Sequence, residues 1–588
     1  MSPFDQQVTR STRRRVVGGA LAASLAGPAS HLASPTANAR QNATTHVQAV
    51  ASAHQAATDA GIGVLQDGGS AADAAIAVAG VLSVVEGWFS NVLGGGTWGL
   101  YYDASTGEVT SLDGVGPTGS LATREDYAGR AGESGIHQSN VPGAWDGWMT
   151  WLLEYGRLDL GRLLQPAIDL ARNGHEASAE LESWASRLED EIMEFPDSKA
   201  VYAPNGKLPV EGDTIVMEHL AATFDALVTA YDGALGESRE AAIQAARDYY
   251  YRGPIAEALV TFSDENDGYL TLEDFNGFAA GIVTPLSITY RDDIVVYENP
   301  PNSQGITMLL ALNILKGMGL EGRNVDNPDA VHTQIEAMKL AFADRYTHIG
   351  DPARVEMPID ELLSEDYAAQ QRDRIDLTRA MAWPITSGMS VNAPAHTTTF
   401  QVVDRDGNAA AVTTSLGAHF LVAGDTGIHM NNRMRMLSVE PGNPNELTPA
   451  YKVRHTSCPY MVLRGGRPWF LGGNTGADTQ PQGQVQQFLS VVEFGLGAQD
   501  AISRPRWLTT AFPSGTYEWE IGNQLRTQEG FYGPLISALK NRGHDVVEGE
   551  GTFGSASMVI LNDDGTDADY GVEPSFELAA GTVIPAGS

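Results

Sequence analysis

The stretch of sequence that decides the fold reads Ala395-His396-Thr397-Thr398-Thr399-Phe400-Gln401-Val402-Val403-Asp404-Arg405-Asp406-Gly407-Asn408. Its first two residues are the end of segment 378–396. That segment contains proline and glycine, has no hydrophobic period and is typical of a loop. Alternating apolar residues predict a strand over Thr399–Asp404 and, after the turn at 405–408, a second strand over Ala409–Ser415. The sequence therefore predicts a loop that runs directly into a β-hairpin.

The rest of the chain contains helical and strand-like segments in turn. Residues from His46 to Gly80 have a helical pattern in which Ser70 is placed to cap a helix, and helices dominate from Val141 to about Ala280. Further helices are expected at Ile306–Met318 and Ala330–Tyr346, and strands at Leu100–Tyr102, Gly107–Val109, Ile294–Tyr297, Tyr460–Leu463, Trp469–Gly472 and Ser557–Leu561. This order predicts an α+β fold with two antiparallel-rich sheets packed face to face between helical layers.

Length and charge limit the class of protein. A chain of 588 residues exceeds one ordinary core, so either two domains or one large layered domain is expected. The net charge of −36 excludes nucleic acid and anionic membranes as partners, because their phosphates would repel the chain. The longest apolar run, Ala74–Val85, has about 12 residues, whereas a membrane span needs roughly 20. A single cysteine, Cys458, excludes an internal disulfide.

The charged residues also suggest a salt-rich environment. The chain has six Lys against 31 Arg, and an acidic surface poor in Lys suits a halophilic protein whose self-repulsion is screened by counter-ions. A GC-rich genome that replaces Lys by Arg explains the same composition equally well. On the halophilic interpretation, the thermal unfolding midpoint should rise as NaCl is raised from low concentration to the molar range. A flat midpoint would leave the acidity as composition alone.

The first residues have the features of an export signal. Thr12-Arg13-Arg14-Arg15-Val16-Val17 resembles a twin-arginine motif, an apolar stretch follows over Val16–Gly27, and Ala37-Asn38-Ala39 is a small-x-small cleavage site. Residues 1–39 are therefore expected to be a twin-arginine-type signal peptide that directs the protein to the periplasm, the cell surface or the medium. The alternative is a disordered basic tail.

Several common catalytic signatures are missing. The sequence contains no G-x-S-x-G, which argues against a serine-hydrolase elbow. His175-Glu176 begins a zinc-protease pattern, but Ala179 stands where the second His would be, and Gly94-Gly95-Gly96 is not followed by the Lys of a phosphate loop. Neither a metal nor an organic cofactor is expected.

Thr397 has a chemical use if the chain is cut between His396 and Thr397. The cut would leave a hydroxyl and a free α-amine on one residue, and an α-amine with a pKa of about 7.7–8.0 can act as the general base for that hydroxyl. The β-methyl group of threonine holds the hydroxyl in few rotamers. The alternative is that Thr397-Thr398-Thr399 is only a β-branched start of a strand.

From His46 to about Ala579 the chain resembles the γ-glutamyltranspeptidase family of N-terminal-nucleophile (Ntn) hydrolases. The segments that carry the resemblance are Ala51–His54, Gly68–Ala75, Val84–Glu86, Gly94–Gly96, Val141–Gly143, Leu163–Ile168, Leu270–Phe275, Pro300–Gly305, Glu336–Arg345 and Gly350–Pro352. The resemblance implies a four-layer αββα fold and a precursor that cuts itself at His396-Thr397. The products would be a large subunit (40–396) and a small subunit (397–588), which together form one composite catalytic domain and remain associated as a heterodimer.

The resemblance also assigns roles to individual residues. Val402-Val403-Asp404-Arg405-Asp406-Gly407-Asn408 matches the end of the family's hairpin and sets Thr397 as the nucleophile and α-amine base. Ser415, eighteen positions later, corresponds to a second hydroxyl that orients the nucleophile. Gly476 and Ala477 match a glycine pair whose backbone N–H groups bind the oxyanion, and Ala477 is expected to have a negative φ. His455 and Thr456 replace two substrate-binding serines.

The residues that read a γ-glutamyl group in this family are not matched. Val109–Thr123, which should supply an Arg for the α-carboxylate, contains none, and Met436 stands in the place of the Asp that should hold the ammonium. Gly417 replaces an Asn, and the lid between Pro441 and Lys452 is short. Arg433 and Arg435 would make the pocket cationic. Asn431-Asn432-Arg433, His455-Thr456 and Gln480-Pro481-Gln482-Gly483 look more like the branch that includes oxamate amidohydrolases.

The sequence therefore predicts an autoprocessing amidohydrolase or acyltransferase that acts on a small-molecule amide, with hydrolysis favoured over transfer. Three alternatives remain open. One is a genuine γ-glutamyltransferase or glutathione hydrolase that reads glutamate with other residues, such as Arg433 or Arg435. Another is a secreted, catalytically dead binding protein on the same fold. The third is an acylase for bulkier acyl amides, which the short lid would admit.

Overall fold

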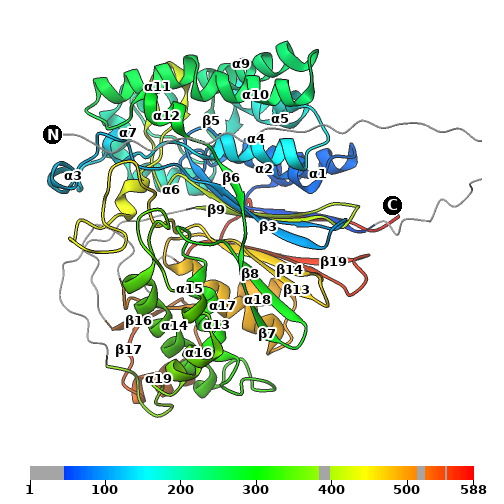
Figure 1. Cartoon of the computed structure of the whole chain (residues 1–588), viewed down its shortest axis with the longest axis vertical. Coiled ribbons are helices and arrows are strands. Elements are labelled where there is room, and N and C mark those ends of the chain that lie inside the picture. The colour runs from blue at the N-terminus through cyan, green and yellow to red at the C-terminus, as the bar shows by residue number, and fades with distance from the viewer. Residues whose placement is uncertain (1–45, 383–396, 513–522, 550–552, 588) are drawn as a thin grey trace, which may run out of the picture. The chain divides into compact units, whose positions relative to one another are not determined.

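Two antiparallel sheets face each other at the centre of the protein, each with a layer of helices on its outer side (Figure 1). The structure is a computed structural model that describes residues 46–382, 397–512, 523–549 and 553–587, and Thr45–Ser588 form one compact unit. The expected signal peptide and His396 lie outside the described residues. This arrangement confirms the four-layer αββα prediction.

The first sheet contains the predicted hairpin. Its order is β20 (Ala580–Ile584), β1 (Gln48–Ser52), β9 (Thr398–Val403), β10 (Ala409–Ser415), β2 (Gly96–Asp103), β3 (Glu108–Gly114) and β6 (Gly281–Val283). The second sheet has the order β19 (Ala568–Val572), β18 (Ala556–Leu561), β14 (Arg467–Asn474), β13 (Tyr460–Arg464), β8 (Ile294–Glu298) and β7 (Leu286–Arg291). Each strand predicted from the sequence overlaps one of these strands.

The helices of the two outer layers come from different parts of the chain (Figure 1). The first sheet is covered by α1 (Gln55–Gln66), α2 (Ala71–Val85), α4 (Ala144–Glu154), α5 (Leu160–Asn173), α9 (Glu218–Leu235) and α10 (Arg239–Tyr251). The second sheet is covered by α13 (Ile306–Leu315), α14 (Pro328–His348), α17 (Thr479–Val492), α18 (Ala498–Ser503) and α19 (Gly533–Asn541).

The remaining elements include eight helices and three small sheets. The helices are α3 (Arg124–Arg130), α6 (Ala179–Arg187), α7 (Glu189–Glu194), α8 (Pro196–Tyr202), α11 (Pro254–Glu265), α12 (Leu272–Gly277), α15 (Ile359–Leu362) and α16 (Glu365–Arg372). The small described sheets consist of β4 (His175–Glu176) with β5 (Thr214–Ile215), β11 (Val422–Ala423) with β12 (Ile428–His429), and β15 (Trp507–Thr509), β16 (Gln524–Thr527) and β17 (Asp545–Glu548). In the described part of the chain no helix is both long and apolar enough to cross a membrane.

Alternating side chains of the central strands build separate cores on the two faces of the first sheet. On β10, Ala410 and Val412 belong to the core beneath the first helical layer, whereas Ala409 and Ala411 belong to the core between the sheets. Successive side chains of a strand point to opposite faces, so both faces of β10 are apolar. The small alanine side chains between the sheets allow the two sheets to pack closely. The predicted hairpin is thus a pair of strands that are buried on both faces.

The segment His46–Gly80 begins differently from the prediction. Residues Gln48–Ser52 form β1, a strand between β20 and β9, and the first helix starts only after His54. The helix prediction for this strand is wrong because its small residues have no strand pattern of their own. They form a strand by pairing with β9 and β20, which lie far away in the sequence. The second helix is confirmed, since Ser70 caps α2 in a capping box with Asp73.

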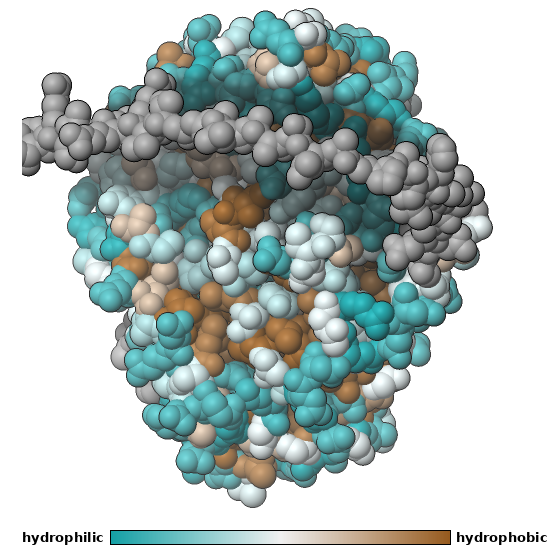
Figure 2. Space-filling model, turned by 45° about the vertical axis from the view of Figure 1, so that its right-hand side comes forward, coloured by the Kyte–Doolittle hydropathy of each residue, from teal (hydrophilic) through white to brown (hydrophobic). Residues whose placement is uncertain are grey.

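Polar residues dominate the surface, as the acidic composition requires. Figure 2 shows one face on which hydrophilic residues cover most of the rim and apolar residues gather towards the middle. The described chain nevertheless buries three large apolar clusters, one under each helical layer and one between the sheets. Both faces of each sheet are therefore packed against apolar clusters, which makes the central strands a rigid support for the residues at their ends.

Candidate active site

Thr397 lies immediately before β9, beside the last residue of β10. The two strands pair in antiparallel register, with Thr398 opposite Thr414, so the start of β9 meets the end of β10 at Ser415. The Oγ1 atom of Thr397 is 3.1 Å from the Oγ atom of Ser415. Both residues are buried, with 3% and 0% of their surface exposed. The hairpin register thus brings together the two hydroxyl residues chosen from the sequence.

Two N–H groups also bind the Ser415 hydroxyl. Its Oγ atom accepts a hydrogen bond from Nη2 of Arg433 and another from the backbone N–H of Gly417, at 3.2 Å. A hydroxyl oxygen has two lone pairs and one hydrogen. Both N–H groups compete with Thr397 for the lone pairs of the Ser415 oxygen, whereas in the contact between Ser415 and Thr397 either hydroxyl can donate.

Gly417 is required by its surroundings. It has a φ of 105°, and a Cβ atom there would lie 1.8 Å from Oδ1 of Asn432. Asn432 therefore occupies the space that a side chain at position 417 would need. Its own amide donates to the carbonyl of Ala418 at 3.0 Å, which keeps the turn after β10 closed.

Arg433 is a buried cation next to the two hydroxyl groups. It begins a 3₁₀ turn, Arg433–Met436, and Asn431 fixes that turn by accepting hydrogen bonds from the backbone of Arg433 and Asn140. Besides Ser415, the guanidinium donates through Nη1 to the Thr456 hydroxyl at 3.2 Å. Burial lowers the pKa of Arg433 to about 9, so it remains charged at neutral pH.

No described carboxylate lies within ion-pair distance of Arg433, although only 1% of the residue is exposed. Its Nε atom also has no hydrogen-bond partner among the described residues. A buried charge without a counter-charge is costly, and the cost falls when an anion binds. The surroundings of Arg433 therefore suit an anionic ligand.

His455 is a neutral ring close enough to feel the charge of Arg433. Its Nδ1 atom accepts a hydrogen bond from the backbone N–H of Ser457 at 3.2 Å, which assigns the ring hydrogen to Nε2. In the described residues Nε2 has no partner. Burial, and then the charges of Arg433 and Lys452, hold the pKa of His455 well below its usual value, so the ring is neutral. A neutral N–H beside Arg433 is again suited to an anion.

The glycine-pair region follows β14. Gly473 allows β14 to cross close to β9, since a Cβ atom there would lie 2.0 Å from Oγ1 of Thr399. Gly476 and Ala477, a few residues on, have φ values of 93° and 52°. The expectation of a negative φ at Ala477 is therefore wrong. Left-handed backbone costs about 1 kcal/mol for an alanine, so surrounding contacts must hold this residue in place.

The two other residues predicted to bind substrate have different environments. Met436 is buried in an apolar cluster that also contains Ala477, Leu437 and Val453. It is thus a packing residue and offers no charge for an ammonium group. Arg435 is half-buried, and no described contact joins it to Ser415 or Thr456. Of the two arginines, Arg433 is the one with a described contact to Ser415.

A group of possible metal ligands lies elsewhere, between α14 and β17. Ring nitrogens of His332 and His544 are 2.8 Å apart, and Glu336 contributes an oxygen nearby. Lys339, however, already places its ammonium 2.9 Å from Glu336, and His332 donates to the carbonyl of Asp376 at 2.9 Å. The carboxylate of Glu336 is thus already paired with a cation, and we assign the group no metal ion.

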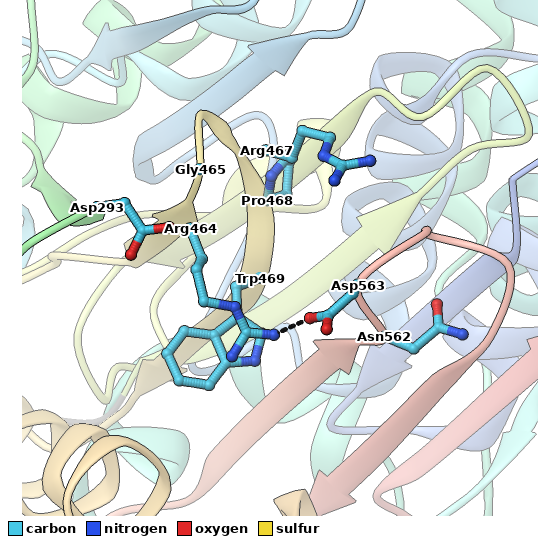
Figure 3. Close-up of a pocket in the computed structure, with 8 residues that line it drawn as sticks. All are labelled: Asp293, Arg464, Gly465, Arg467, Pro468, Trp469, Asn562 and Asp563. Carbon is cyan, nitrogen blue, oxygen red and sulfur yellow. Dashed lines mark hydrogen bonds and ion pairs between the residues drawn. The ribbon is translucent and has the colours of Figure 1, made fainter.

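A surface hollow of about 270 Å³ lies at the other end of β14 (Figure 3). Its Arg464 lies over the ring of Trp469, 3.9 Å from the centroid, and pairs with Asp563. Seven residues of extended strand, roughly 23 Å, separate this end of β14 from Asn474. The hollow is therefore remote from Thr397, and its arginine already has partners.

Comparison with known proteins shows which family the chain belongs to. Residues 57–574 match the family model described as gamma-glutamyltranspeptidase. The chain is 33% identical to the glutathione hydrolase-like YwrD proenzyme of Bacillus subtilis, over 91% of this chain and 98% of that protein. It is 30% identical to the oxamate amidohydrolase proenzyme of Klebsiella pneumoniae, with 86% and 92% covered. The structure of the cephalosporin acylase from Bacillus halodurans superposes with a TM-score of 0.79 at 29% identity, covering 94% of this chain and 98% of that one.

Proposed function

Because the chain belongs to the γ-glutamyltranspeptidase family, it is an amidohydrolase or acyltransferase, and we propose that it hydrolyses amides of small anionic acyl groups after cutting itself before Thr397. The large subunit would comprise residues 40–396 and the small subunit residues 397–588. They would stay together because the strands of the first sheet alternate between them: β1 and β2 precede the cut, whereas β9, β10 and β20 follow it.

The proposed reaction uses the residues at the ends of the central strands β9 and β10. The Thr397 hydroxyl attacks the amide carbonyl while its own α-amine takes the proton, and that proton then goes to the leaving amine. The backbone N–H groups of Gly476 and Ala477 stabilise the oxyanion. Water then attacks the acyl-threonine ester, or an amine does so in transfer. The Ser415 hydroxyl, 3.1 Å from the Thr397 oxygen, supports the nucleophile throughout by donating a hydrogen bond to that oxygen.

Ser415→Ala should lower turnover by about 10- to 100-fold, the effect of losing a hydrogen bond worth about 1–3 kcal/mol. Ser415→Thr keeps the hydroxyl and should restore most of the rate. Steady-state kinetics on fully cleaved protein would measure both. An unchanged rate in cleaved Ser415→Ala would make Ser415 a packing residue only.

The substrate proposal depends on the unpaired charge of Arg433. An anionic acyl group would supply the counter-charge that the described residues do not, and the His455 N–H is a second donor beside it. A γ-glutamyl group carries an ammonium as well, and in this chain Met436 stands where a carboxylate should meet it. An acyl group of the oxamate kind has the carboxylate and lacks the ammonium. The oxamate amidohydrolase relative supports the same choice.

The test compares γ-glutamyl-p-nitroanilide with oxamate and simple acyl anilides, using cleaved enzyme in molar salt. Each lost charge-assisted contact costs about 1.5–3 kcal/mol, so kcat/KM for the γ-glutamyl compound should be lower by roughly a hundredfold or more. If that compound is turned over at least as efficiently as the best of the others, the protein is an ordinary γ-glutamyl hydrolase. The glutathione hydrolase-like relative makes this the second candidate function.

We also propose that residues 1–39 are a twin-arginine-type signal peptide and that the mature enzyme works outside the cytoplasm in a salt-rich medium. The proposal is supported by the motif at Thr12–Val17 and by the acidic, Lys-poor composition. The mass of the large subunit isolated from the native host would test it, since a subunit that begins near position 40 is expected.

A further inference from the structure

We propose that Gln304 is a positioning residue, which sets the oxyanion loop of the small subunit from the large subunit. The inference rests on the proposed function, because it assumes that the N–H groups of Gly476 and Ala477 bind the oxyanion. Gln304 lies 93 residues before Thr397, within Pro300–Gly305, a segment that carries the family resemblance but to which the sequence assigned no role. It has no exposed surface and lies between two loops that line the site.

The side-chain amide of Gln304 joins these two loops. Its Nε2 atom donates to the carbonyl of Thr456 at 2.9 Å and to the carbonyl of Ala477 at 3.0 Å. Both amide hydrogens are thereby used, one for the loop that carries Thr456 and one for the oxyanion loop. The Oε1 atom accepts from Nη1 of Arg345 at 2.8 Å, which fixes the orientation of the amide.

The backbone of Gln304 is fixed as firmly as its side chain. Its N–H donates to the carbonyl of His455 at 2.9 Å, and the N–H of His455 donates to the carbonyl of Asn302 at 2.7 Å. Ser303 pairs with His455 as a parallel bridge, and its hydroxyl donates to the carbonyl of Ser457 at 2.8 Å. The segment 302–304 thus runs beside 455–457 like a short extra strand.

Arg345 holds the other side of Ala477. This buried residue of α14 forms a two-point ion pair with Asp478, the residue after Ala477, and its second contact, Nη2 to Oδ2, measures 3.0 Å. The guanidinium also lies 4.6 Å from the ring centroid of Phe342. The carbonyl of Ala477 and the next side chain are therefore both held by large-subunit residues.

These contacts explain how an alanine keeps a left-handed backbone. The φ of 52° at Ala477 is disfavoured for any residue with a Cβ atom, and the Gln304 donor is lost if the peptide rotates. Without Gln304, the Ala477 carbonyl keeps, among the described donors, only the N–H of Gln480 at 3.2 Å, and the peptide groups on both sides of Ala477 are expected to turn. A misplacement of about 1 Å in a catalytic group costs on the order of a hundredfold in rate.

Gln304→Ala tests the inference, with Gln486→Ala as the matched control. Like Gln304, Gln486 donates both amide hydrogens to backbone carbonyls, those of Gln482 and Trp507, and its oxygen accepts from the N–H of Trp507. These contacts hold β15 and not the oxyanion loop. In cleaved Gln304→Ala, kcat should fall by about 100-fold with KM within about threefold, because the oxyanion forms only in the transition state. Gln486→Ala should stay within about twofold of wild type in both constants.

A second readout separates positioning from general loosening. A simple aliphatic boronic acid forms a tetrahedral adduct with the Thr397 hydroxyl, so its affinity should fall in Gln304→Ala in proportion to kcat. A kcat within about threefold of wild type, or an unchanged boronate affinity, would overturn the inference. If Gln304→Ala does not fold or cleave, Arg345→Lys decides by the same readouts, with an expected loss of about tenfold. A wild-type protein that stays one chain and binds no boronate contradicts the proposed function instead.

Discussion

Thr397→Ala should remain a single chain and lose amidase activity by about 10⁴-fold or more, the scale seen when a covalent nucleophile is removed. The expected effect is this large because one hydroxyl performs two reactions. In the precursor it attacks the preceding peptide carbonyl in an N→O acyl shift, and in the cut enzyme it attacks the substrate. Without the cut, the α-amine that should act as base stays in a peptide bond.

Two further variants control this experiment. Thr397→Ser keeps the hydroxyl but loses the methyl group that restricts χ1, so it should be cut and active at a reduced rate. Thr398→Val removes the next hydroxyl of the same strand without changing its shape, and it should be cut like the wild type. Gel electrophoresis and turnover of the best acyl anilide measure both reactions. A Thr397→Ala chain that still divides would exclude Thr397 as the nucleophile of cleavage.

Arg433→Met should reduce kcat/KM for oxamate by about 10³-fold, and for a neutral acyl anilide by only about tenfold. The larger loss combines the carboxylate contact, about 1.5–3 kcal/mol, with the weaker donation of Ser415 to Thr397. The loss for the neutral anilide comes only from the weaker hydrogen bond between Ser415 and Thr397. Because the substitution removes an unpaired buried charge, the thermal midpoint should stay level or rise.

Arg435→Met is the matched control for Arg433→Met. It removes the same charge two residues away, where the side chain is half-buried, and it should leave both substrates within about threefold of wild type. Equal losses for charged and neutral substrates in Arg433→Met would show that Arg433 serves only Ser415. A larger effect at Arg435 would move the anion site to that residue.

The parts of the fold that follow local patterns could be predicted from the sequence. The hairpin β9–β10 has alternating apolar residues around an Asp-Gly turn, and the start of α2 has a capping box. The strand β1 could not be predicted in this way. Its residues are small, and only pairing with β9 and with β20, more than five hundred residues away, makes them a strand.

The site shows the same division. The family resemblance pairs Thr397 with Ser415, and the hairpin register brings their hydroxyl oxygens to 3.1 Å. The φ of Ala477 could not be predicted, because its carbonyl is bound by Gln304, which lies 173 residues earlier in the chain. The contact of Arg433 with Ser415 depends likewise on the turn fixed by Asn431. Polar contacts between distant segments leave no periodic signal in a sequence.

The most direct test of the account is the N-terminal residue of the small fragment. Purified protein should show two bands, the smaller of roughly 20 kDa, which is the share of the 62.6 kDa chain carried by residues 397–588. Edman sequencing or intact mass should then read Thr397-Thr398-Thr399-Phe400 with a free α-amine. A fragment that begins at any other residue, or a chain that never divides, would contradict the assignment of Thr397 as an N-terminal nucleophile.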